Sequence, residues 1–274
     1  MRSSPRWPIE RMQAIAQAVH VDSSGRGAQV ALLHGWAMHA GVLAPLADAL
    51  AAEFRVHAVD LPGHGHSARL RPWTVERAMQ AIEARFADGD SPIDVVGWSL
   101  GALVALAWAH AHPRRVRRLV LIAATPKFVA DAQWPHAMSA DTLRRFADEL
   151  RVAYQPTLQR FLALQVRGSD DGRATLAALR KKLFSRGAPD AALLHDALDA
   201  LAATDLRDVA ARVDVRTLVM AGDRDTLAPL EASRWLAATM PDARLCVIEG
   251  AAHAPFVSHP QPAQSAIASF LRDG

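Results

Sequence analysis

The sequence predicts an α/β fold: a mostly parallel, doubly wound sheet with an all-helical segment inserted into it. Strand-like apolar runs alternate with helical patterns over residues 28–126 and again over 214–274, which is typical of a parallel sheet covered on both faces. From 127 to 213 the strand pattern disappears, and Ala, Leu and Arg recur at helical spacing. We therefore expect residues 28–126 and 214–274 to form one core and residues 127–213 to form a helical lid. Residues 1–27 would hold an N-terminal extension and the first strand.

The composition fits one large domain of this kind. Of the 274 residues, 51% are hydrophobic and 22% are charged, which is enough to bury a sizeable core. No apolar run reaches the length of a membrane span and the first residues lack an apolar signal core, so we expect a cytoplasmic protein with no membrane partner. The single cysteine, Cys246, lies in a strand-like run, which favours a buried inert thiol over a nucleophile. A monomer is the expected state.

The charge balance does not indicate a nucleic-acid partner. The net charge is only +3, because 31 basic residues are matched by 28 acidic ones. The only dense basic cluster, residues 114–118, lies between Pro113 and an apolar run, where a solvated corner between a helix and a strand is expected.

The individual elements follow from apolar runs and the residues that break them. Gln29–Leu33 is almost continuously apolar, as a strand buried on both faces should be. Thr74 is suited to cap or begin a helix. The pattern predicts strands over 18–22, 29–33, 54–59, 93–98, 118–124, 216–221 and 244–249. It predicts helices over 42–52, 74–86, 100–112 and 230–238, a last helix ending at 271, and four or five helices between 127 and 213.

The clearest chemical signal is the motif Gly97-Trp98-Ser99-Leu100-Gly101. A β-branched strand-like run precedes it and an Ala- and Leu-rich helical run follows, which is the strand–turn–helix context of a nucleophile elbow. The two glycines would lie where strand and helix nearly touch, with no room for a Cβ. Ser99 is therefore the candidate nucleophile, exposed at the N-terminus of a helix.

A serine needs a base and an orienting carboxylate, and two later loops supply them. The strand over 216–221 leads into a loop that holds Asp223 and Asp225, and the strand over 244–249 leads into one that holds His253. The order Ser, Asp, His is the one expected in such a sheet. Asp225 is preferred because an apolar residue and a nearby proline follow it, whereas Asp223 suits a turn-forming role. His259, just before a proline, is interpreted as structural.

The tetrahedral intermediate would need two backbone donors. The amide of Leu100 is one, and the amide of Trp36, in the loop after an early strand, is the other. His34 and Gly35 would shape that loop, with His34 as a hydrogen-bonded turn residue rather than an acid or base.

Two further patterns, a glycine-rich turn and a pair of histidines, resemble parts of cofactor or metal sites. Residues 63–68 follow a strand and formally match a dinucleotide fingerprint, with Glu83 about 20 residues on. Pro62 and the stretch over 69–72 do not open a helix at that turn, so phosphates would lack a helix N-terminus. His64 and His66 suggest a metal pair, but no third ligand follows closely. We expect neither a cofactor nor a metal.

With these residues in place, the chain resembles the α/β-hydrolase family over roughly residues 28–273. Within that family it resembles the esterases that act on the methyl ester of pimeloyl-[acyl-carrier protein] in biotin biosynthesis. The stretches that carry the resemblance are residues 32–36, 59–63, 97–101, 133–135, 161–165 and 251–260. The Gly-Trp-Ser-Leu-Gly elbow and Phe161-Leu162-Ala163-Leu164-Gln165 are the discriminating pieces. The first two dozen residues depart from the family pattern.

The resemblance implies a cofactor-free carboxylesterase that releases pimeloyl-[acyl-carrier protein] and methanol through a Ser-His-Asp acyl-enzyme mechanism. It also favours Asp225 over Asp223. The substrate-binding residues it implies are Trp36, Ser99, Leu100, Phe161, Leu164, Gln165 and His253. Phe128 and Trp134 are further candidates for the pocket wall, with a core position equally open.

The predicted lid is basic. Between residues 160 and 186 it holds seven basic residues and two acidic ones. Such a surface would suit an acidic acyl-carrier protein as partner, but a solvated helical face explains it equally well. The resemblance favours docking at Arg160 and Arg173, which match family positions.

Two alternative functions stay open. The same triad and fold would serve a general short-chain carboxylesterase, lactonase or thioesterase. The fold also occurs in lyases and in inactive binding proteins, and a fold by itself does not establish a function.

Overall fold

A seven-stranded sheet forms the centre of the protein, in a computed structural model that describes residues 17–87, 89 and 91–273. The strand order is β1-β3-β2-β4-β5-β6-β7; β1 pairs antiparallel with β3, and the other strands pair in parallel. The strands are β1 (Val21–Ser24), β2 (Gln29–Leu33), β3 (Arg55–Val59), β4 (Ile93–Trp98), β5 (Val116–Ile122), β6 (Thr217–Gly222) and β7 (Ala243–Ile248). The predicted fold class is confirmed. The expectation for residues 1–16 lies outside the described residues.

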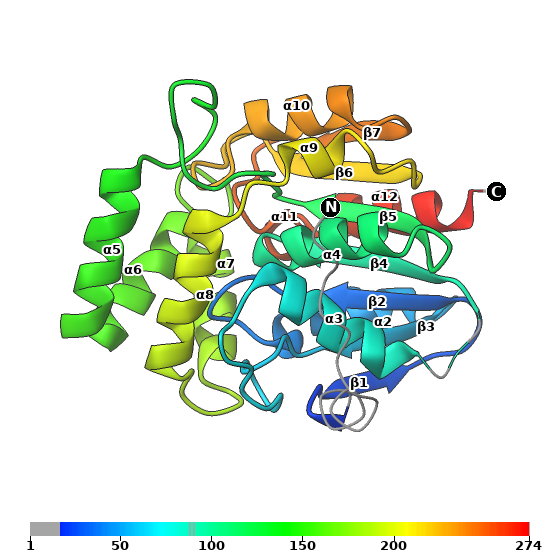
Figure 1. Cartoon of the computed structure of the whole chain (residues 1–274), viewed down its shortest axis with the longest axis horizontal. Coiled ribbons are helices and arrows are strands. Elements are labelled where there is room, and N and C mark those ends of the chain that lie inside the picture. The colour runs from blue at the N-terminus through cyan, green and yellow to red at the C-terminus, as the bar shows by residue number, and fades with distance from the viewer. Residues whose placement is uncertain (1–16, 88, 90, 274) are drawn as a thin grey trace.

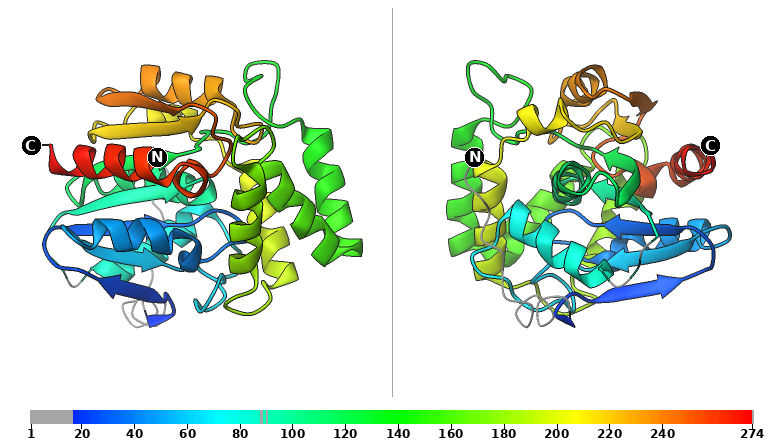
Figure 2. Two further views of the ribbon diagram at one scale, coloured as in Figure 1. Left: turned by 180° about the vertical axis from the view of Figure 1, so that it is seen from behind. Right: turned by 45° about the vertical axis from the view of Figure 1, so that its right-hand side comes forward.

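Helices cover both faces of this sheet (Figure 1). Helices α3 (Val75–Phe86) and α4 (Leu100–Ala111) pack together on one face. Figure 2 shows α2 (Ala44–Leu50) and α12 (Pro260–Arg272) side by side on the other face. All six residues of β4 are buried, which explains why its sequence is apolar except for Asp94 instead of alternating. The remaining elements near the sheet are η1 (Ala40–Leu43), α9 (Arg207–Ala210), α10 (Leu230–Thr239) and α11 (Pro255–Ser258).

Most helix positions agree with the sequence, and one is divided. Thr74 caps α3 as predicted: its hydroxyl accepts from the Arg77 amide at 3.1 Å. The single helix expected over 42–52 is instead a 3₁₀ turn, η1, followed by α2. The break has two local causes: His39 caps the turn through the Gly41 amide at 3.0 Å, and Pro45 has no N–H and so suits the first turn of a new helix.

Four helices between β5 and β6 form a separate group, which we call the insertion helices. They are α5 (Ala140–Val152), α6 (Tyr154–Gln165), α7 (Gly172–Leu183) and α8 (Ala191–Ala203). In Figure 1 they stand at the end of the sheet toward which the parallel strands point. Because loops that follow parallel strands meet at that edge, a site built from these loops lies between the sheet and the insertion helices.

The basic cluster at residues 114–118 is part of the framework at the opposite edge. Arg117 binds the fully buried carboxylate of Asp94 through two hydrogen bonds of 2.9 and 2.6 Å. Arg118, which is 5% exposed, lies near the same carboxylate and donates to the Asp273 carbonyl at 2.7 Å. Arg115 donates to the backbone carbonyls of residues 86, 89 and 91. These contacts occupy three of the cluster's four arginines.

The structure also bears on membrane insertion. Within the described ranges, no helix has both the length and the apolar character needed to cross a bilayer.

Replacing Asp94 with Ala tests the importance of this buried pair. The change leaves Arg118 buried without its carboxylate, so we expect the free energy of unfolding to fall by about 3 kcal/mol in urea titrations. Asp141→Ala, which removes one partner of an exposed ion pair with Arg144, is the control and should change it little. Equal effects of the two substitutions would contradict this account of Asp94.

Candidate active site

Ser99 occupies a strained turn between β4 and α4. Its backbone angles, φ 55° and ψ −115°, lie in a region that side chains rarely adopt. A Cβ on Gly97 would lie 2.4 Å from the Gly101 carbonyl oxygen, and a Cβ on Gly101 would lie 2.3 Å from the Leu33 oxygen. Both positions therefore require glycine, Gly97 for the close approach of β4 and α4 and Gly101 for the close approach of α4 and the end of β2. This close approach leaves the Ser99 side chain half-exposed at the head of α4.

Three predicted residues from separate loops meet in a hydrogen-bonded row. His253 Nε2 lies 2.9 Å from Ser99 Oγ, and His253 Nδ1 lies 2.8 Å from Asp225 Oδ2. The side chains of His253 and Asp225 are 2% and 0% exposed. In this arrangement a carboxylate binds one nitrogen of the imidazole and leaves the other facing a hydroxyl, as nucleophilic catalysis by serine requires.

The two aspartates of the loop after β6 have different partners. Asp225 Oδ1 accepts from the amides of Leu227 and Ala228 at 2.8 and 3.0 Å, which fixes its carboxylate beside the imidazole. Asp223 instead accepts from the Gly250 amide at 2.8 Å and so ties the loop after β6 to the loop after β7. The geometry therefore agrees with the preference for Asp225.

The loop after β2 passes directly beside Ser99, since a Cβ on Gly35 would lie 3.3 Å from the Ser99 Cβ. His34 shapes this loop. Its Nε2 accepts from the Leu61 amide at 2.9 Å, so its Nδ1–H donates to the Gly35 carbonyl at 2.8 Å. Burial lowers the pKa of His34 well below its ordinary value, and the neutral ring that results suits this turn role. The Trp36 amide follows in the same loop, and the Leu100 amide begins α4; their use as oxyanion donors stays a prediction.

An apolar cavity opens onto Ser99 and His253. Its wall includes Trp36, Phe128, Met138, Phe146 and Phe161, so it is built by the core and the insertion helices together. The Trp36 indole packs edge-on against the rings of Phe161 and Phe146, with centroids 4.9 and 5.6 Å apart. The cavity volume is about 40 Å³, room for a few water molecules at most.

The other predicted pocket residues have different positions. Leu164 is half-buried and is not part of this wall. Gln165 is 1% exposed and meets the site through its backbone carbonyl, which accepts from the His253 amide at 3.0 Å. Trp134 lies in the core, where its indole donates to the Lys127 carbonyl at 2.9 Å and packs on Trp235.

Phe146 also lines the cavity wall, although it was not among the predicted pocket residues. Leu143, Phe146 and Leu150 recur at helical spacing along α5, and that stripe is the signal that would have shown an inward face.

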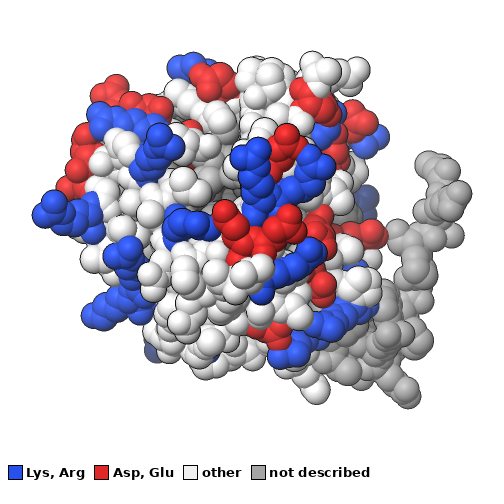
Figure 3. All heavy atoms as spheres, turned by 90° about the vertical axis from the view of Figure 1, so that its left-hand side faces the viewer, with Lys and Arg blue, Asp and Glu red and all other residues white. Residues whose placement is uncertain are grey.

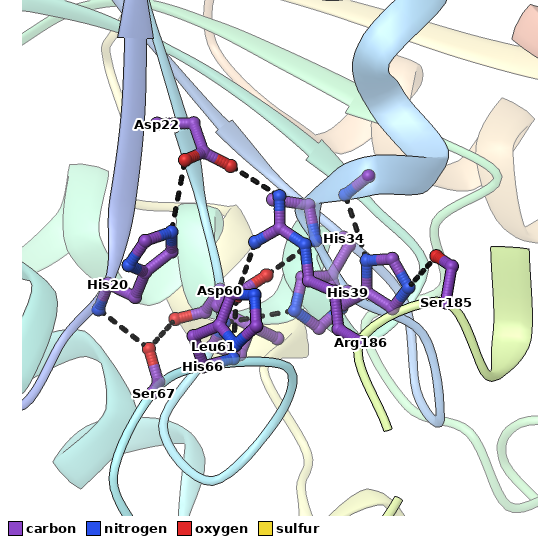
Figure 4. Close-up of polar contacts among 12 residues, drawn as sticks. His20, Asp22, His34, His39, Asp60, Leu61, His66, Ser67, Ser185 and Arg186 are labelled. Atoms are coloured by element: carbon purple, nitrogen blue, oxygen red, sulfur yellow. Dashed lines mark hydrogen bonds and ion pairs between the residues drawn. The ribbon is translucent and has the colours of Figure 1, made fainter. Parts of the chain in front are cut away.

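A polar network fixes the loop after β3 and ties it to the insertion helices (Figure 4). Asp60, which is fully buried, accepts from the Ala40 amide at 2.7 Å and from the His66 amide at 2.8 Å. It also accepts from Arg186 at 2.7 Å, and Arg186 in turn pairs with Asp22. Arg186 follows α7, so this lid arginine serves an internal contact.

This network also explains the glycine pattern that resembles a dinucleotide fingerprint. A Cβ on Gly65 would lie 2.2 Å from the Asp60 carboxylate, so the glycine makes room for that side chain. The next helix, α3, begins only at Val75, as expected. Across residues 17–87, 89 and 91–273, no group of three or more His, Cys, Asp or Glu side chains is placed to hold a metal ion.

Comparison with known proteins identifies the class. The alpha/beta hydrolase fold family matches residues 30–260, and the chain therefore belongs to that family. Solved structures agree: an esterase from Exiguobacterium antarcticum superposes with a TM-score of 0.85 at 21% identity, over 93% of this chain and 96% of that one. An enol-lactonase from Burkholderia xenovorans LB400 superposes with a TM-score of 0.82 at 22% identity, over 93% and 96%. At these identities the likeness concerns the fold alone.

Sequence relatives are more specific. A pimeloyl-[acyl-carrier protein] methyl ester esterase of Chromobacterium violaceum is 44% identical over 251 residues, which is 92% of this chain and 97% of that protein. A protein of the same name from Xanthomonas campestris pv. campestris is 42% identical over 253 residues, or 92% and 98%.

Buried histidines near the site predict a loss of stability in acid. Burial lowers the pKa of His64 to about 4, and the unfolded value is about 6.5. As pH falls from 6.5 toward 4, the unfolded chain binds protons that the folded chain does not, so the free energy of unfolding should fall. His64→Gln removes this proton from the balance. Between pH 6 and 4.5 the free energy of unfolding of the variant should therefore change less steeply with pH than that of the parent, by up to about 1.4 kcal/mol per pH unit, the effect of one proton. Urea titrations at a series of pH values measure it, and an unchanged slope would contradict the assignment.

Proposed function

We propose that this protein hydrolyses the methyl ester of pimeloyl-[acyl-carrier protein], releasing methanol and the free carboxylate in biotin biosynthesis. The observation that carries the proposal is the row Ser99–His253–Asp225, which opens onto an apolar cavity. The chain that holds this row is 41–44% identical, over nearly its whole length, to relatives named for this activity.

In the proposed mechanism His253 acts first as a base and then as an acid. Its Nε2 takes the proton of Ser99 Oγ, which attacks the ester carbonyl carbon, while Asp225 holds the imidazole in the required tautomer. The amides of Trp36 and Leu100 donate to the oxyanion. When the intermediate collapses, His253 protonates the departing methoxide. His253 then takes a proton from water, which attacks the acyl-enzyme. When this second intermediate collapses, His253 returns the proton to Ser99 Oγ and the acid is released.

The insertion helices supply the acyl-chain pocket in this proposal, and residues 127–213 act as its lid. Phe161, on α6, faces the catalytic serine across the cavity and would contact the chain. Leu164 and Gln165 lie on the same helix. The cavity is narrow and apolar, which suits an extended acyl chain.

The outer face of the lid is the proposed docking surface for the carrier protein. Figure 3 shows this face with Lys and Arg side chains gathered along one edge and acidic side chains mixed among others toward the middle. Arg173, at the start of α7, is exposed. Arg160, on α6, is exposed and pairs with Glu149. An acidic carrier protein would be steered to such a face by long-range attraction, which salt weakens.

A paired assay tests the substrate. Hydrolysis of carrier-bound pimeloyl methyl ester is compared with hydrolysis of a free short-chain aryl ester, at low and high salt. We expect a strong preference for the carrier-bound ester that salt erodes, and a loss of at least about 10³-fold in Ser99→Ala for both esters. Equal, salt-independent turnover of the two would indicate a general short-chain esterase. Unchanged turnover in Ser99→Ala would refute the mechanism.

Charge reversal tests the docking surface. Arg173→Glu should raise KM for the carrier-bound ester about tenfold at low salt and leave the free aryl ester unaffected, because only the carrier-bound ester uses this face. Arg114→Glu makes the same charge change at the far edge of the sheet and should leave KM for both esters unaffected. Equal effects of the two substitutions would place docking elsewhere.

A further inference from the structure

Both backbone polar groups of the catalytic His253 are held by hydrogen bonds. Its amide donates to the carbonyl of Gln165 at 3.0 Å. Its carbonyl accepts from the indole nitrogen of Trp98 at 2.8 Å. The first partner belongs to an insertion helix and the second to the strand that carries the nucleophile, so three segments far apart in the sequence meet at one residue.

Trp98 is rigidly placed relative to Ser99. It is the last residue of β4, directly precedes the nucleophile and is 1% exposed. Its ring packs edge-on against Phe256 with centroids 5.1 Å apart, and it lies tilted against the His253 imidazole at 5.8 Å. The indole N–H therefore aims at the His253 carbonyl from a position set by the nucleophile elbow itself.

The Gln165 carbonyl is an equally natural partner. Gln165 ends α6, and the last carbonyls of a helix have no acceptor role within the helix. The His253 amide fills this place. The free carbonyl at the end of α6 and the backbone amide of His253 thus form a hydrogen bond with each other.

The loop that carries His253 is anchored before this residue: the Gly250 amide donates to Asp223, and the carbonyls of Gly250 and Ala251 accept from the amides of Asp170 and Arg224. None of these bonds reaches the peptide groups of His253 itself. The loop runs through Gly250, which has a positive φ of 75°, and through the small residues Ala251, Ala252 and Ala254. Asp225 fixes the rotation of the imidazole through one hydrogen bond, but a bond at the end of the side chain does not fix where the backbone lies. The contacts to the His253 backbone supply that restraint.

We propose that Trp98 is a positioning residue for His253, and that the end of α6 completes the clamp, so that lid closure and alignment of the base are coupled. The inference rests on the proposed function, because it assigns His253 the role of base. Removal of the indole N–H lets the imidazole drift from Ser99 Oγ, which slows the proton transfer without altering the pocket that binds the acyl chain.

Trp98→Phe tests this directly, because it keeps an aromatic ring and deletes the donor. Trp73→Phe is the matched control: Trp73 is 2% exposed and its indole also donates to a backbone carbonyl, that of Pro62, at 2.9 Å. We expect Trp98→Phe to lower kcat about tenfold on both the carrier-bound and the aryl ester, with KM within about twofold of the parent. Trp73→Phe should leave kcat unchanged, although both variants lower the melting temperature to a similar extent.

The outcomes separate this inference from the proposed function. If Trp98→Phe and Trp73→Phe have the same kcat, the positioning role is overturned. If the parent protein fails on the carrier-bound ester but Trp98→Phe still lowers kcat on the aryl ester, the substrate proposal fails and the positioning role stands.

Hydrogen exchange tests the second half of the clamp. The amide proton of His253 should exchange slowly in the full-length protein, and its exchange should rise together with that of the α6 amides as denaturant is added. Exchange at the rate of an unprotected loop amide would overturn the coupling to α6.

Discussion

The close contact between strand β4 and helix α4 is the constraint on which the rest of the site depends. Gly97 allows the backbones of β4 and α4 to approach within distances that a Cβ would prevent, and Gly101 does the same for α4 and the end of β2. The turn between the two glycines holds Ser99 at a positive φ. The strain is acceptable because β4 is buried in the middle of the sheet, with β2 and β5 on either side. The nucleophile therefore follows a buried strand in the middle of the sheet.

The loops around Ser99 are held by polar contacts that are themselves buried. His34 binds across from the loop after β2 to the loop after β3, and Asp60 accepts from both loops. Asp225, which is buried, binds His253 and so joins the loops after β6 and β7, and Asp223, which is exposed, joins the same loops through the Gly250 amide. Each of these acceptors except the exposed Asp223 is buried, and each meets a backbone amide that would otherwise lack a partner.

The insertion helices contribute more than a cover. Their aromatic side chains close the cavity over Ser99, Arg186 ties them to Asp60 in the core, and the end of α6 binds the backbone of His253. The end of α6 and the segment that follows it therefore meet the loop of His253 at two places, Gln165 with His253 and Asp170 with Gly250.

The sequence by itself determined the fold class, the position of the elbow and the order of the loops. These follow from local rules: apolar runs mark strands buried on both faces, glycines mark close approach, and the loops after parallel strands share one edge. The same rules led to Ser99, Asp225 and His253, which the structure brings within hydrogen-bonding distance.

Only the tertiary structure decided which side chains line the cavity and which hold the loops in place. Phe146 faces the nucleophile, Trp134 lies in the core, and Gln165 contributes its carbonyl instead of its side chain. Trp98 stands at a variable position of the elbow motif, but in the structure its indole N–H donates to the His253 carbonyl. The physical reason is that packing between helix and sheet, and hydrogen bonds between residues far apart in the chain, leave no periodic signal in the sequence.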